Sequence, residues 1–517
     1  MSVQGLQVHP GTYVDSMLLM ASTVTMDSHE AVRWAGATMA SDRGLADLAA
    51  AGFTGSELDG LGGNDLVLAV KADDNDAVQQ ALQAGWEAVS TERPGPSAGA
   101  EQGPPTSIAQ AVRRLDGANV AIVSVPGEYA ALEAHHALTA GLHVLLFSDG
   151  VPLEEEIELK ARAAGLGLLV MGPGAGTAVL GGTGLGFANV LRGGGAASGA
   201  VGVVAAAGTG AQEVSALLDR WGVAVSQVVG VGGRDLSQDV AGRMAQLAAR
   251  AMDADPGTDV VLLVSKPPSA SAAATVLAEC TTTRAVAVFL GLDDVDAPDG
   301  VQLAPTLEQG TLAAARLVGA SLPLLVEGLV ARVATAAAGL GPSRRTVRGL
   351  FSGGTLCYEA QYVLEGLLGP IHSNEPLRKA NGLPAPAGAH VLLDLGAEEY
   401  TRGRPHPMID LGTRLEALEE LVGDPEVAVV LMDVVLGHGS HDDPAGQLAP
   451  VCERLMADGG PVVVVHVLGT ESDPQSYSRQ RATLERAGCL VAETNARAAY
   501  AAGAVVRREP GLAASGA

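Results

Sequence analysis

One strand–turn–helix pattern occurs twice in this sequence, and the repeat restricts the folds that the chain can adopt. The two copies are VGVVAAAGTGAQEVSALLDRWG (201–222) and RGLFSGGTLCYEAQYVLEGLLG (348–369), and each runs from a small-residue or apolar strand through a Gly/Thr turn into a helix. Further on, MDADPGTDVVLLVSKPP (252–268) aligns with LVGDPEVAVVLMDVVLG (421–437). Because the period is far longer than that of a solenoid repeat, it indicates a duplicated domain.

Short apolar strands alternate with helices through most of the chain, which predicts parallel sheets covered by helices. The first part differs, because its strands and helices fit a small α+β domain of the ferredoxin-like type. A Pro-, Gly- and Ser-rich segment after it indicates a linker. We therefore divide the chain into a small α+β domain at 1–90, a linker at 91–107, an α/β domain at 108–192, a second at 200–306, a helical connector at 307–345, a third α/β domain at 346–506 and a tail at 507–517.

The net charge of −26 excludes whole classes of partner. A chain this acidic is unsuited to nucleic acid or an anionic membrane, although backbone dipoles still allow a small anionic ligand. The cysteines, which are Cys280, Cys357, Cys452 and Cys489, are far apart, so they fit a reducing compartment and give no metal site. The first residues lack a signal-peptide pattern and no apolar run could cross a bilayer, so we expect a cytoplasmic protein.

Both repeated turns lie where ligands bind in open parallel sheets, beyond the carboxyl ends of the strands. At a helix start the first N–H groups have no partner within the helix, and the aligned peptide dipoles add about half a positive charge. Glycine lets a ligand approach the backbone, and Thr or Ser adds a hydroxyl donor. One such turn would be an ordinary tight turn, but two in duplicated modules make a phosphate or carboxylate cradle an equal interpretation. Its predicted residues are Gly208, Thr209, Gly210, Ser352, Gly353, Gly354 and Thr355.

Arginines follow strands at corresponding places in the two repeats. Arg234, in VGVGGRDLS, could pair bidentately with a phosphate or carboxylate, or it could be a surface arginine capped by Asp235. The roughly equivalent segment TRGRPHPMID offers Arg402, Arg404 and His406 at the same sheet edge. Two arginines at equivalent strand ends modestly favour an anion site.

Two further strand ends carry candidates with more than one interpretation. Lys266 follows an apolar strand in VLLVSKPP, which is suggestive in a chain with few lysines, but a solvated lysine is an equal alternative. The loop LGHGSHDDPAG holds His438, His441, Asp442 and Asp443, which could form a metal or acid–base cluster. A loop with an Asp that caps the next helix is the favoured interpretation of that segment.

Several of these segments resemble known proteins. VPGEYAALEAHHALTAGLHVLLFSDGVPLEEEIELKARAAGLGLLVMGPGAG (125–176) resembles the CoA-binding domain of the succinyl-CoA synthetase α subunit. SGGTLCYEA (352–360) resembles that subunit's SGT-x-x-YEA turn, and GPVVVVHVLGTESDPQSYSRQRATLERAG (460–488) resembles the end of the β subunit's ligase domain. With GTGAQEVSALLDRWGVAVSQVVGVGGRDLS and VLLVSKPP, the arrangement is similar to the FdrA family over nearly the whole chain. The resemblance implies an α/β fold in which a CoA-binding Rossmann-like domain precedes two flavodoxin-like ligase domains.

The departures from the synthetase determine which activity the resemblance implies. The synthetase passes phosphate through a histidine, but the matching segment, LGLDDVDAPDGVQLAPTLEQG (290–310), contains none. The synthetase's catalytic glutamate would fall near SKPP and is absent, and the Gly-rich CoA loop is missing. Residues 1–90 are too few for an ATP-grasp domain.

FdrA relatives are implicated, with two companion subunits, as an oxamate carbamoyltransferase of allantoin breakdown. The resemblance therefore implies that this chain, in a hetero-oligomer, interconverts oxalurate plus phosphate with oxamate plus carbamoyl phosphate. Phosphate or carbamoyl phosphate would be the ligand, with CoA as an alternative. Arg234 and Arg404 would orient the phosphate, and His406 and His438 are candidates for the proton acceptor. An acyl-CoA ligase and a non-catalytic subunit that binds a phosphorylated metabolite remain alternatives.

Overall fold

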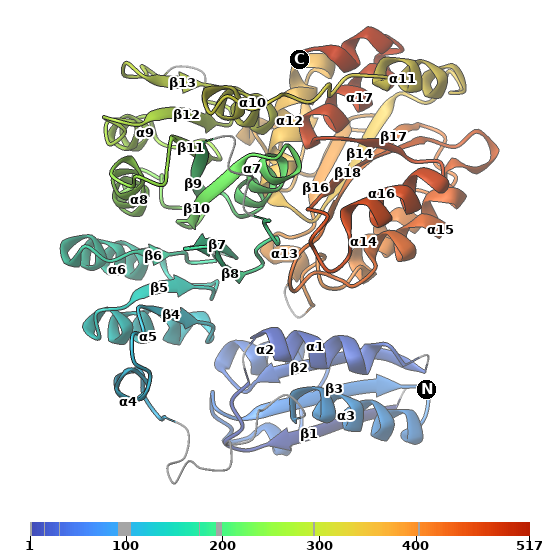
Figure 1. The fold of residues 1–517 in the computed structure, drawn as a ribbon. Helices are drawn as coiled ribbons and strands as arrows, with labels where there is room; N and C mark the ends of the chain where they lie inside the picture. Colours follow the sequence, from blue (N-terminus) through green and yellow to red (C-terminus); the bar gives the residue numbers. More distant parts are fainter. Residues whose placement is uncertain are drawn as a thin grey trace.

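Four sheets follow one another along the chain, two small ones first and two large ones after them (Figure 1). The computed structural model describes residues 3–14, 16–29, 31–90, 105–174, 176–192, 199–292, 295–401 and 404–516. Most of the predicted linker and Arg402 lie outside these described residues. The α/β fold class predicted from the sequence is confirmed. Among the helices of the described ranges, none has the length and apolar character needed to cross a bilayer.

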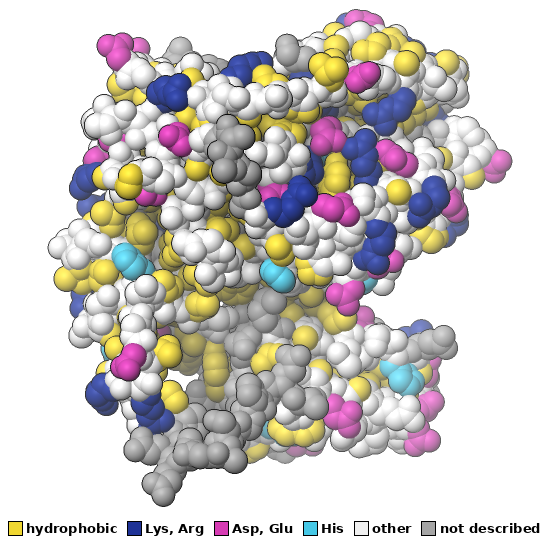
Figure 2. Space-filling model, viewed as in Figure 1, with side chains coloured by type: hydrophobic (Ala, Val, Ile, Leu, Met, Phe, Trp, Pro, Cys, Tyr) yellow, Lys and Arg dark blue, Asp and Glu magenta, His cyan; other side chains and the backbone are white. Residues whose placement is uncertain are grey.

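The N-terminal domain is an antiparallel sheet of order β1-β3-β2 with helices on both faces. Alternate residues of the central strand point to opposite faces, as the pleat of a strand requires. Leu66, Leu68 and Val70 are buried on the side of α1 and α3, whereas Val67 and Ala69 are buried on the side of α2. The space-filling view shows a recess between this domain and the second large domain (Figure 2). The elements are β1 (Val3–His9), α1 (Ser16–Asp27), β2 (Val32–Met39), α2 (Asp42–Ala50), η1 (Ser56–Leu58), β3 (Leu66–Ala72) and α3 (Asn75–Ser90).

A parallel three-stranded sheet of order β4-β5-β6 follows. Its elements are α4 (Ile108–Arg114), β4 (Val120–Val123), α5 (Gly127–Thr139), β5 (His143–Leu146), α6 (Leu153–Leu166) and β6 (Val170–Met171). One buried apolar cluster joins this sheet to the next, because it contains Leu145 and Met171 as well as Val204 and Leu263. The Rossmann-like part is thus packed firmly on the first large domain.

The first large sheet has the order β13-β12-β11-β9-β10-β7-β8. The hairpin β7-β8 pairs antiparallel with β10, so residues 177–186, which we assigned to the preceding domain, hydrogen-bond into this sheet. The elements are β7 (Thr177–Leu180), β8 (Thr183–Gly186), β9 (Ala200–Ala206), α7 (Gly208–Arg220), β10 (Ala224–Gly230), α8 (Arg243–Asp253), β11 (Val260–Ser265), α9 (Ala270–Leu277), β12 (Arg284–Phe289), β13 (Val301–Leu303), α10 (Leu307–Leu317) and α11 (Leu329–Ala338).

The second large sheet is parallel and has the order β15-β16-β14-β17-β18-β19. Its β16-β14-β17-β18-β19 corresponds to β10-β9-β11-β12-β13 of the first sheet. Each half therefore has the strand order 2-1-3-4-5 of flavodoxin-like folds, and the repeat seen in the sequence is a repeat of topology. The elements are β14 (Thr346–Phe351), α12 (Gly354–Leu368), β15 (Ile371–His372), η2 (Lys379–Asn381), β16 (His390–Asp394), α13 (Glu398–Thr401), α14 (Gly412–Glu419), β17 (Val427–Val435), α15 (Pro444–Met456), η3 (Ala457–Gly459), β18 (Val462–Leu468), α16 (Tyr477–Arg486), β19 (Leu490–Ala492), α17 (Asn495–Arg507) and η4 (Pro510–Ala514).

The repeated helices α7 and α12 pack against each other between the two halves, and each carries a buried glutamate. Oε1 of Glu359 accepts a hydrogen bond from the amide of Leu307, the first residue of α10, at 2.6 Å. Oε1 of Glu213 accepts one from the amide of Asn495, the first residue of α17, at 3.3 Å. Each glutamate therefore caps the start of a helix in the opposite half, so each copy of the repeat contributes a hydrogen bond to the interface between the halves.

The buried position of Glu359 predicts a pH-dependent stability. Burial raises the pKa of Glu359 to about 8 from the ordinary value of 4.5, although Asn495 donates to its carboxylate. Between these values the folded chain binds a proton that the unfolded chain does not, so stability falls as pH rises. We expect Glu359→Gln to remove this slope, which is at most about 1.4 kcal/mol per pH unit. Urea unfolding across this range measures the slope, and Glu365→Gln is the control, because Glu365 is a partly exposed ion-pair residue of the same helix. Equal slopes in wild type and Glu359→Gln would contradict the prediction.

Candidate functional site

A cavity of about 650 Å³, which we name the turn cavity, lies where the two repeated turns meet. The amide of Thr355 donates to Oγ1 of Thr209 at 3.3 Å, so the turns contact each other directly. Gly208, Thr209, Ser352, Gly354 and Thr355 line the cavity, together with residues of the N-terminal and Rossmann-like domains. The structure thus brings the two predicted turns together at one site.

Two of the predicted glycines lie behind the lining, where the turns pack on each other. A Cβ on Gly210 would lie 3.0 Å from Cγ2 of Thr355, and one on Gly353 would lie 2.9 Å from Cγ2 of Thr209. Both distances are shorter than an ordinary Cβ contact, so a side chain at either position would require the threonine of the other turn to shift. Gly210 and Gly353 therefore allow the close approach of the turns, rather than facing the cavity as expected.

Asp433, on β17, accepts hydrogen bonds from groups of the second turn that we expected to bind a ligand. Its carboxylate accepts from the Ser352 amide at 2.8 Å, the Ser352 hydroxyl at 2.9 Å and the Gly353 amide at 2.7 Å. Arg414 balances the charge, with its NH2 2.6 Å from Oδ1 of Asp433, and both side chains are buried. The Ser352 hydroxyl thus donates to Asp433, contrary to the expectation that it would donate to the ligand, which leaves Gly354 and Thr355 as the other residues of this turn that face the cavity.

Lys266 and Asp394 converge on Gly354. Lys266 follows β11 and lines the cavity, and Asp394 ends β16 and is only 5% exposed. A Cβ on Gly354 would collide with Oδ2 of Asp394 and lie 3.3 Å from Nζ of Lys266. Burial raises the pKa of Asp394 to about 6, and the positive charge of Lys266 acts in the opposite direction. Asp394, which the sequence analysis missed, is therefore a group that titrates near neutral pH beside the start of α12. Its one sequence signal is its position at the carboxyl end of a strand.

Arg234 lines the turn cavity and is held by the Rossmann-like domain. Its Nε donates to Oε2 of Glu156 at 2.8 Å, and its NH2 donates to the carbonyl of Val151 at 2.7 Å. The fully buried Lys160 is 2.9 Å from Oε1 of Glu156 and 2.8 Å from Oδ1 of Asp235. Asp235 thus pairs with Lys160 and does not cap Arg234. The buried network fixes the guanidinium of Arg234 at the cavity wall.

The other predicted catalytic residues are dispersed. His406 lines the turn cavity, its Nδ1 accepts from the amide of Met408 at 3.2 Å, and burial lowers its pKa to about 4, so it is neutral at pH 7. Arg404 is 53% exposed, pairs with Glu416 at 3.0 Å and lines a different cavity. His438 is exposed and outside the lining of both cavities. The expectation that Arg234 and Arg404 clamp one phosphate together is therefore wrong.

The turn cavity is positive on one side although the chain as a whole is acidic. Lys266, Arg234 and the starts of α7 and α12 face it. The amides of Gly208 and Thr209 precede the first hydrogen bond of α7, which Ala211 donates to Ala207, so they are available to a ligand. On the outer face drawn in Figure 2, by contrast, Lys and Arg are interspersed with Asp and Glu. The arrangement can bind a phosphate-sized anion and accept a proton beside it.

Comparisons with known proteins relate this scaffold to CoA ligases. Residues 350–505 match the family described as CoA-ligase, and residues 1–105 match the one described as AllF, heavy metal-associated domain. YahF of Escherichia coli (strain K12), which is described as uncharacterized, is 35% identical over 511 residues, covering 96% of this chain and 97% of that protein. The ADP-forming succinate–CoA ligase subunit alpha 2 of Archaeoglobus fulgidus is 33% identical over 129 residues, which is 25% of this chain and 44% of that protein.

Two further matches are a relative and a solved structure. The ADP-forming sulfoacetate-CoA ligase subunit SauD of Bilophila wadsworthia is 30% identical over 156 residues, which is 29% of this chain and 50% of that protein. Among solved structures, the apo form of the dinucleotide-forming acetyl-coenzyme A synthetase 1 of Ca. Korarchaeum cryptofilum has a TM-score of 0.32 at 15% identity, covering 79% of this chain and 86% of that one. The matched parts of the chain are thus similar to CoA ligases of the succinyl-CoA synthetase type, whereas the finer FdrA assignment stays a prediction.

The description of the N-terminal family raises the question of a heavy-metal site. Soft metals select cysteine thiolates, and residues 1–105 contain no cysteine. In the part of the chain that the structure describes, no group of three or more His, Cys, Asp and Glu side chains is placed to hold a metal ion. The residues of this domain therefore do not fit a heavy metal.

Proposed function

This chain belongs to the same family as YahF of Escherichia coli, and from that premise we propose that it is the phosphate-binding subunit of a carbamoyltransferase. The proposed reaction interconverts oxalurate plus phosphate with oxamate plus carbamoyl phosphate. Companion subunits in a hetero-oligomer complete the enzyme. In this function the starts of α7 and α12 bind the phosphate group.

The convergence of two helix starts and Lys266 on one cavity carries the proposal. A phosphate placed there would meet the free amides at the start of α7, the start of α12 and a lysine side chain. Such preorganised donors stabilise a phosphate both when it attacks and when it leaves. Residues 290–310, where the resemblance places the synthetase's phosphohistidine, contain no histidine. Direct transfer between phosphate and the carbamoyl group is therefore favoured over a phosphohistidine relay.

The proposed step balances with one proton transfer. An oxygen of hydrogen phosphate attacks the terminal carbonyl carbon of oxalurate, the C–O bond forms, and the C–N bond to the oxamate nitrogen breaks. The departing nitrogen needs a proton and the attacking phosphate gives one up. Asp394, with a pKa of about 6, can accept that proton as a carboxylate and return it to the nitrogen. The neutral His406, which lines the cavity, is a second group that could take part in this transfer.

An acyl-CoA ligase is the second candidate, and two observations favour it. Residues 350–505 match the CoA-ligase family, and two relatives are named as CoA-ligase subunits. The turn cavity also reaches Ser124, Ser148 and Gly174, which lie beyond the ends of β4, β5 and β6. Ligands of open parallel sheets bind at this edge, so a CoA molecule would occupy that end of the cavity.

A matched pair of glycine substitutions tests the first candidate. Gly354→Ala is expected to lower the affinity for carbamoyl phosphate by at least about tenfold, because the added Cβ collides with Asp394 and crowds Lys266. Gly366→Ala, on the same helix, places its Cβ in open space and should leave the affinity unchanged. Isothermal titration of the full chain with carbamoyl phosphate, phosphate and CoA measures both.

The titration separates the candidates. If Gly354→Ala weakens the binding of carbamoyl phosphate and Gly366→Ala does not, the result supports the transferase. If the chain binds CoA and does not bind carbamoyl phosphate, the result contradicts the transferase and supports the ligase. If the chain binds neither, the same titration on the complex with its companion subunits distinguishes a shared active site from a non-catalytic subunit.

A further inference from the structure

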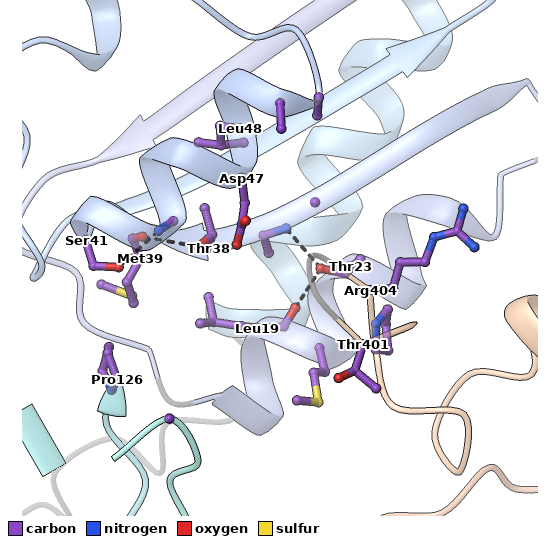
Figure 3. Close-up of a pocket in the computed structure, with 18 of the residues that line it drawn as sticks. Leu19, Thr23, Thr38, Met39, Ser41, Asp47, Leu48, Pro126, Thr401 and Arg404 are labelled. Carbon is purple, nitrogen blue, oxygen red and sulfur yellow. Dashed lines mark hydrogen bonds between the residues drawn. The ribbon is translucent and has the colours of Figure 1, made fainter. Parts of the chain in front are cut away.

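A second cavity of about 650 Å³, which we name the outer cavity, lies between the N-terminal domain and the rest of the chain (Figure 3). It adjoins the turn cavity, because the same residues line both: Leu19, Met20, Met39, Pro126 and Asp149. Two of these are methionines, whose flexible side chains adapt readily to what lies beside them. A molecule in the outer cavity is therefore a direct neighbour of one bound at the turns.

Most hydroxyl groups of the outer cavity are committed to the N-terminal domain itself. Thr23 donates to a backbone carbonyl at 3.0 Å and accepts from a backbone amide at 2.9 Å. Thr38 donates to a carbonyl at 3.2 Å, and Ser41 caps α2 by accepting from an amide at 3.2 Å. The dashed lines of Figure 3 show these bonds. Recognition of a ligand thus falls to the charged residues.

The charged residues that line this cavity are Asp47, Glu128, Asp149 and Arg404, and Asp47 and Arg404 lie at two of its edges (Figure 3). Asp47 projects from α2 and is half-buried, and none of the described residues donates a hydrogen bond to its carboxylate. Arg404 donates through NH1 to Glu416 at 3.0 Å and to Thr413 at 3.4 Å. Its Nε and NH2 have no acceptor among the described residues. The cavity therefore offers carboxylate acceptors, Asp47 among them, and one cation, Arg404, at a different edge.

We infer that the outer cavity binds a small molecule that carries both an N–H donor and a carboxylate, with Asp47 accepting from the N–H and Arg404 pairing with the carboxylate. The inference rests on the proposed function, because oxamate and oxalurate both have this chemistry. The cations of the turn cavity are taken by the phosphate, so a second anionic substrate needs a cation of its own next to that site. Arg404 provides it, which gives this residue a role other than the phosphate contact expected from the sequence.

Titration of the full chain with oxamate tests the inference. Asp47→Ala and Arg404→Gln are each expected to weaken oxamate binding by about tenfold or more while leaving the affinity for carbamoyl phosphate unchanged. Glu416→Gln releases Arg404 from its partner and should leave oxamate binding equal or tighter. Arg454→Gln, which breaks a comparable exposed ion pair with Glu419 outside both cavities, should change neither affinity.

Gly354→Ala separates the two cavities. Oxamate binding that survives Gly354→Ala but not Asp47→Ala supports the outer cavity. If Gly354→Ala abolishes oxamate binding and Asp47→Ala does not affect it, oxamate binds at the turns. That result would overturn the inference and leave the proposed function in place. Failure of the wild-type chain to bind oxamate would overturn it as well. If the chain binds oxamate in an Asp47-dependent way but does not bind carbamoyl phosphate, the result supports the oxamate site in the outer cavity and contradicts the proposed transferase function.

Discussion

Lys266→Met is expected to lower the affinity of the chain for carbamoyl phosphate about 100-fold, the upper end of what one charged hydrogen bond contributes. The ammonium group lies at the meeting point of the two turns, 3.3 Å from the position that a Cβ on Gly354 would take. It also lies over the ring of Tyr358, 5.8 Å from the ring centre. Methionine keeps the length of the side chain and removes the charge, so the loss of affinity reports the charge itself. Isothermal titration at pH 7 measures it.

The same substitution has a second effect that a purely structural role would not produce. Burial raises the pKa of Asp394 to about 6, and Lys266 opposes that rise. Without Lys266 the pKa of Asp394 must rise further, so ionisation of Asp394 requires a higher pH. If Asp394 accepts the phosphate proton, the rate of the assembled enzyme increases with pH through about 6 in the wild type, and this limb moves upward in Lys266→Met.

A second lysine provides the control for this prediction. Lys379, on η2, is exposed and outside the cavity, so Lys379→Met should leave both the affinity and the pH profile unchanged. Equal losses in the two variants would show that carbamoyl phosphate responds only to the overall charge of the chain. An unchanged affinity in Lys266→Met would contradict the site.

The fold of the two large domains could be predicted because its signals are local. The apolar runs that become β9, β11, β14 and β17 are bounded by Gly and Pro, and the repeat fixes their correspondence. The turns could be predicted for the same reason, because a glycine-rich turn between a strand and a helix needs no distant partner. Their contact, through Thr209 and Thr355, follows from the packing of α7 on α12.

The side chains that complete the site could not be predicted, because their roles depend on contacts far apart in the sequence. Asp433 lies inside an apolar strand, and nothing in LMDVV indicates that it takes the donors of Ser352. Arg234 follows the end of β10 after four residues, whereas Arg404 follows the end of β16 after ten residues and beyond α13. The alignment of the two segments is sound, but the longer connection carries Arg404 into the outer cavity.

Glu308→Ala is expected to give the largest loss of stability that we predict, about 3–5 kcal/mol. Glu308, at the start of α10, forms a bidentate pair with Arg497, at the start of α17, with distances of 2.6 to 2.9 Å. Both side chains are completely buried. The hydroxyl of Thr494 also donates to Glu308. Removal of the carboxylate leaves the guanidinium of Arg497 buried, and the carbonyl of Ala513 is then its one hydrogen-bond acceptor among the described residues.

The comparison with a double variant decides what this ion pair contributes. The pair joins equivalent helices of the two halves, next to the glutamate caps, so its loss should also weaken the packing of one half on the other. Urea unfolding of Glu308→Ala measures the penalty of the unpaired charge. Glu308→Leu combined with Arg497→Met removes both charges and should recover most of that loss, because a buried pair stabilises little more than apolar side chains of similar volume. If the double variant is as unstable as Glu308→Ala, the pair itself holds the halves together, and desolvation of Arg497 is not the cause. If Glu308→Ala costs less than about 1 kcal/mol, water reaches Arg497 and the interface between the halves opens more readily than its burial indicates.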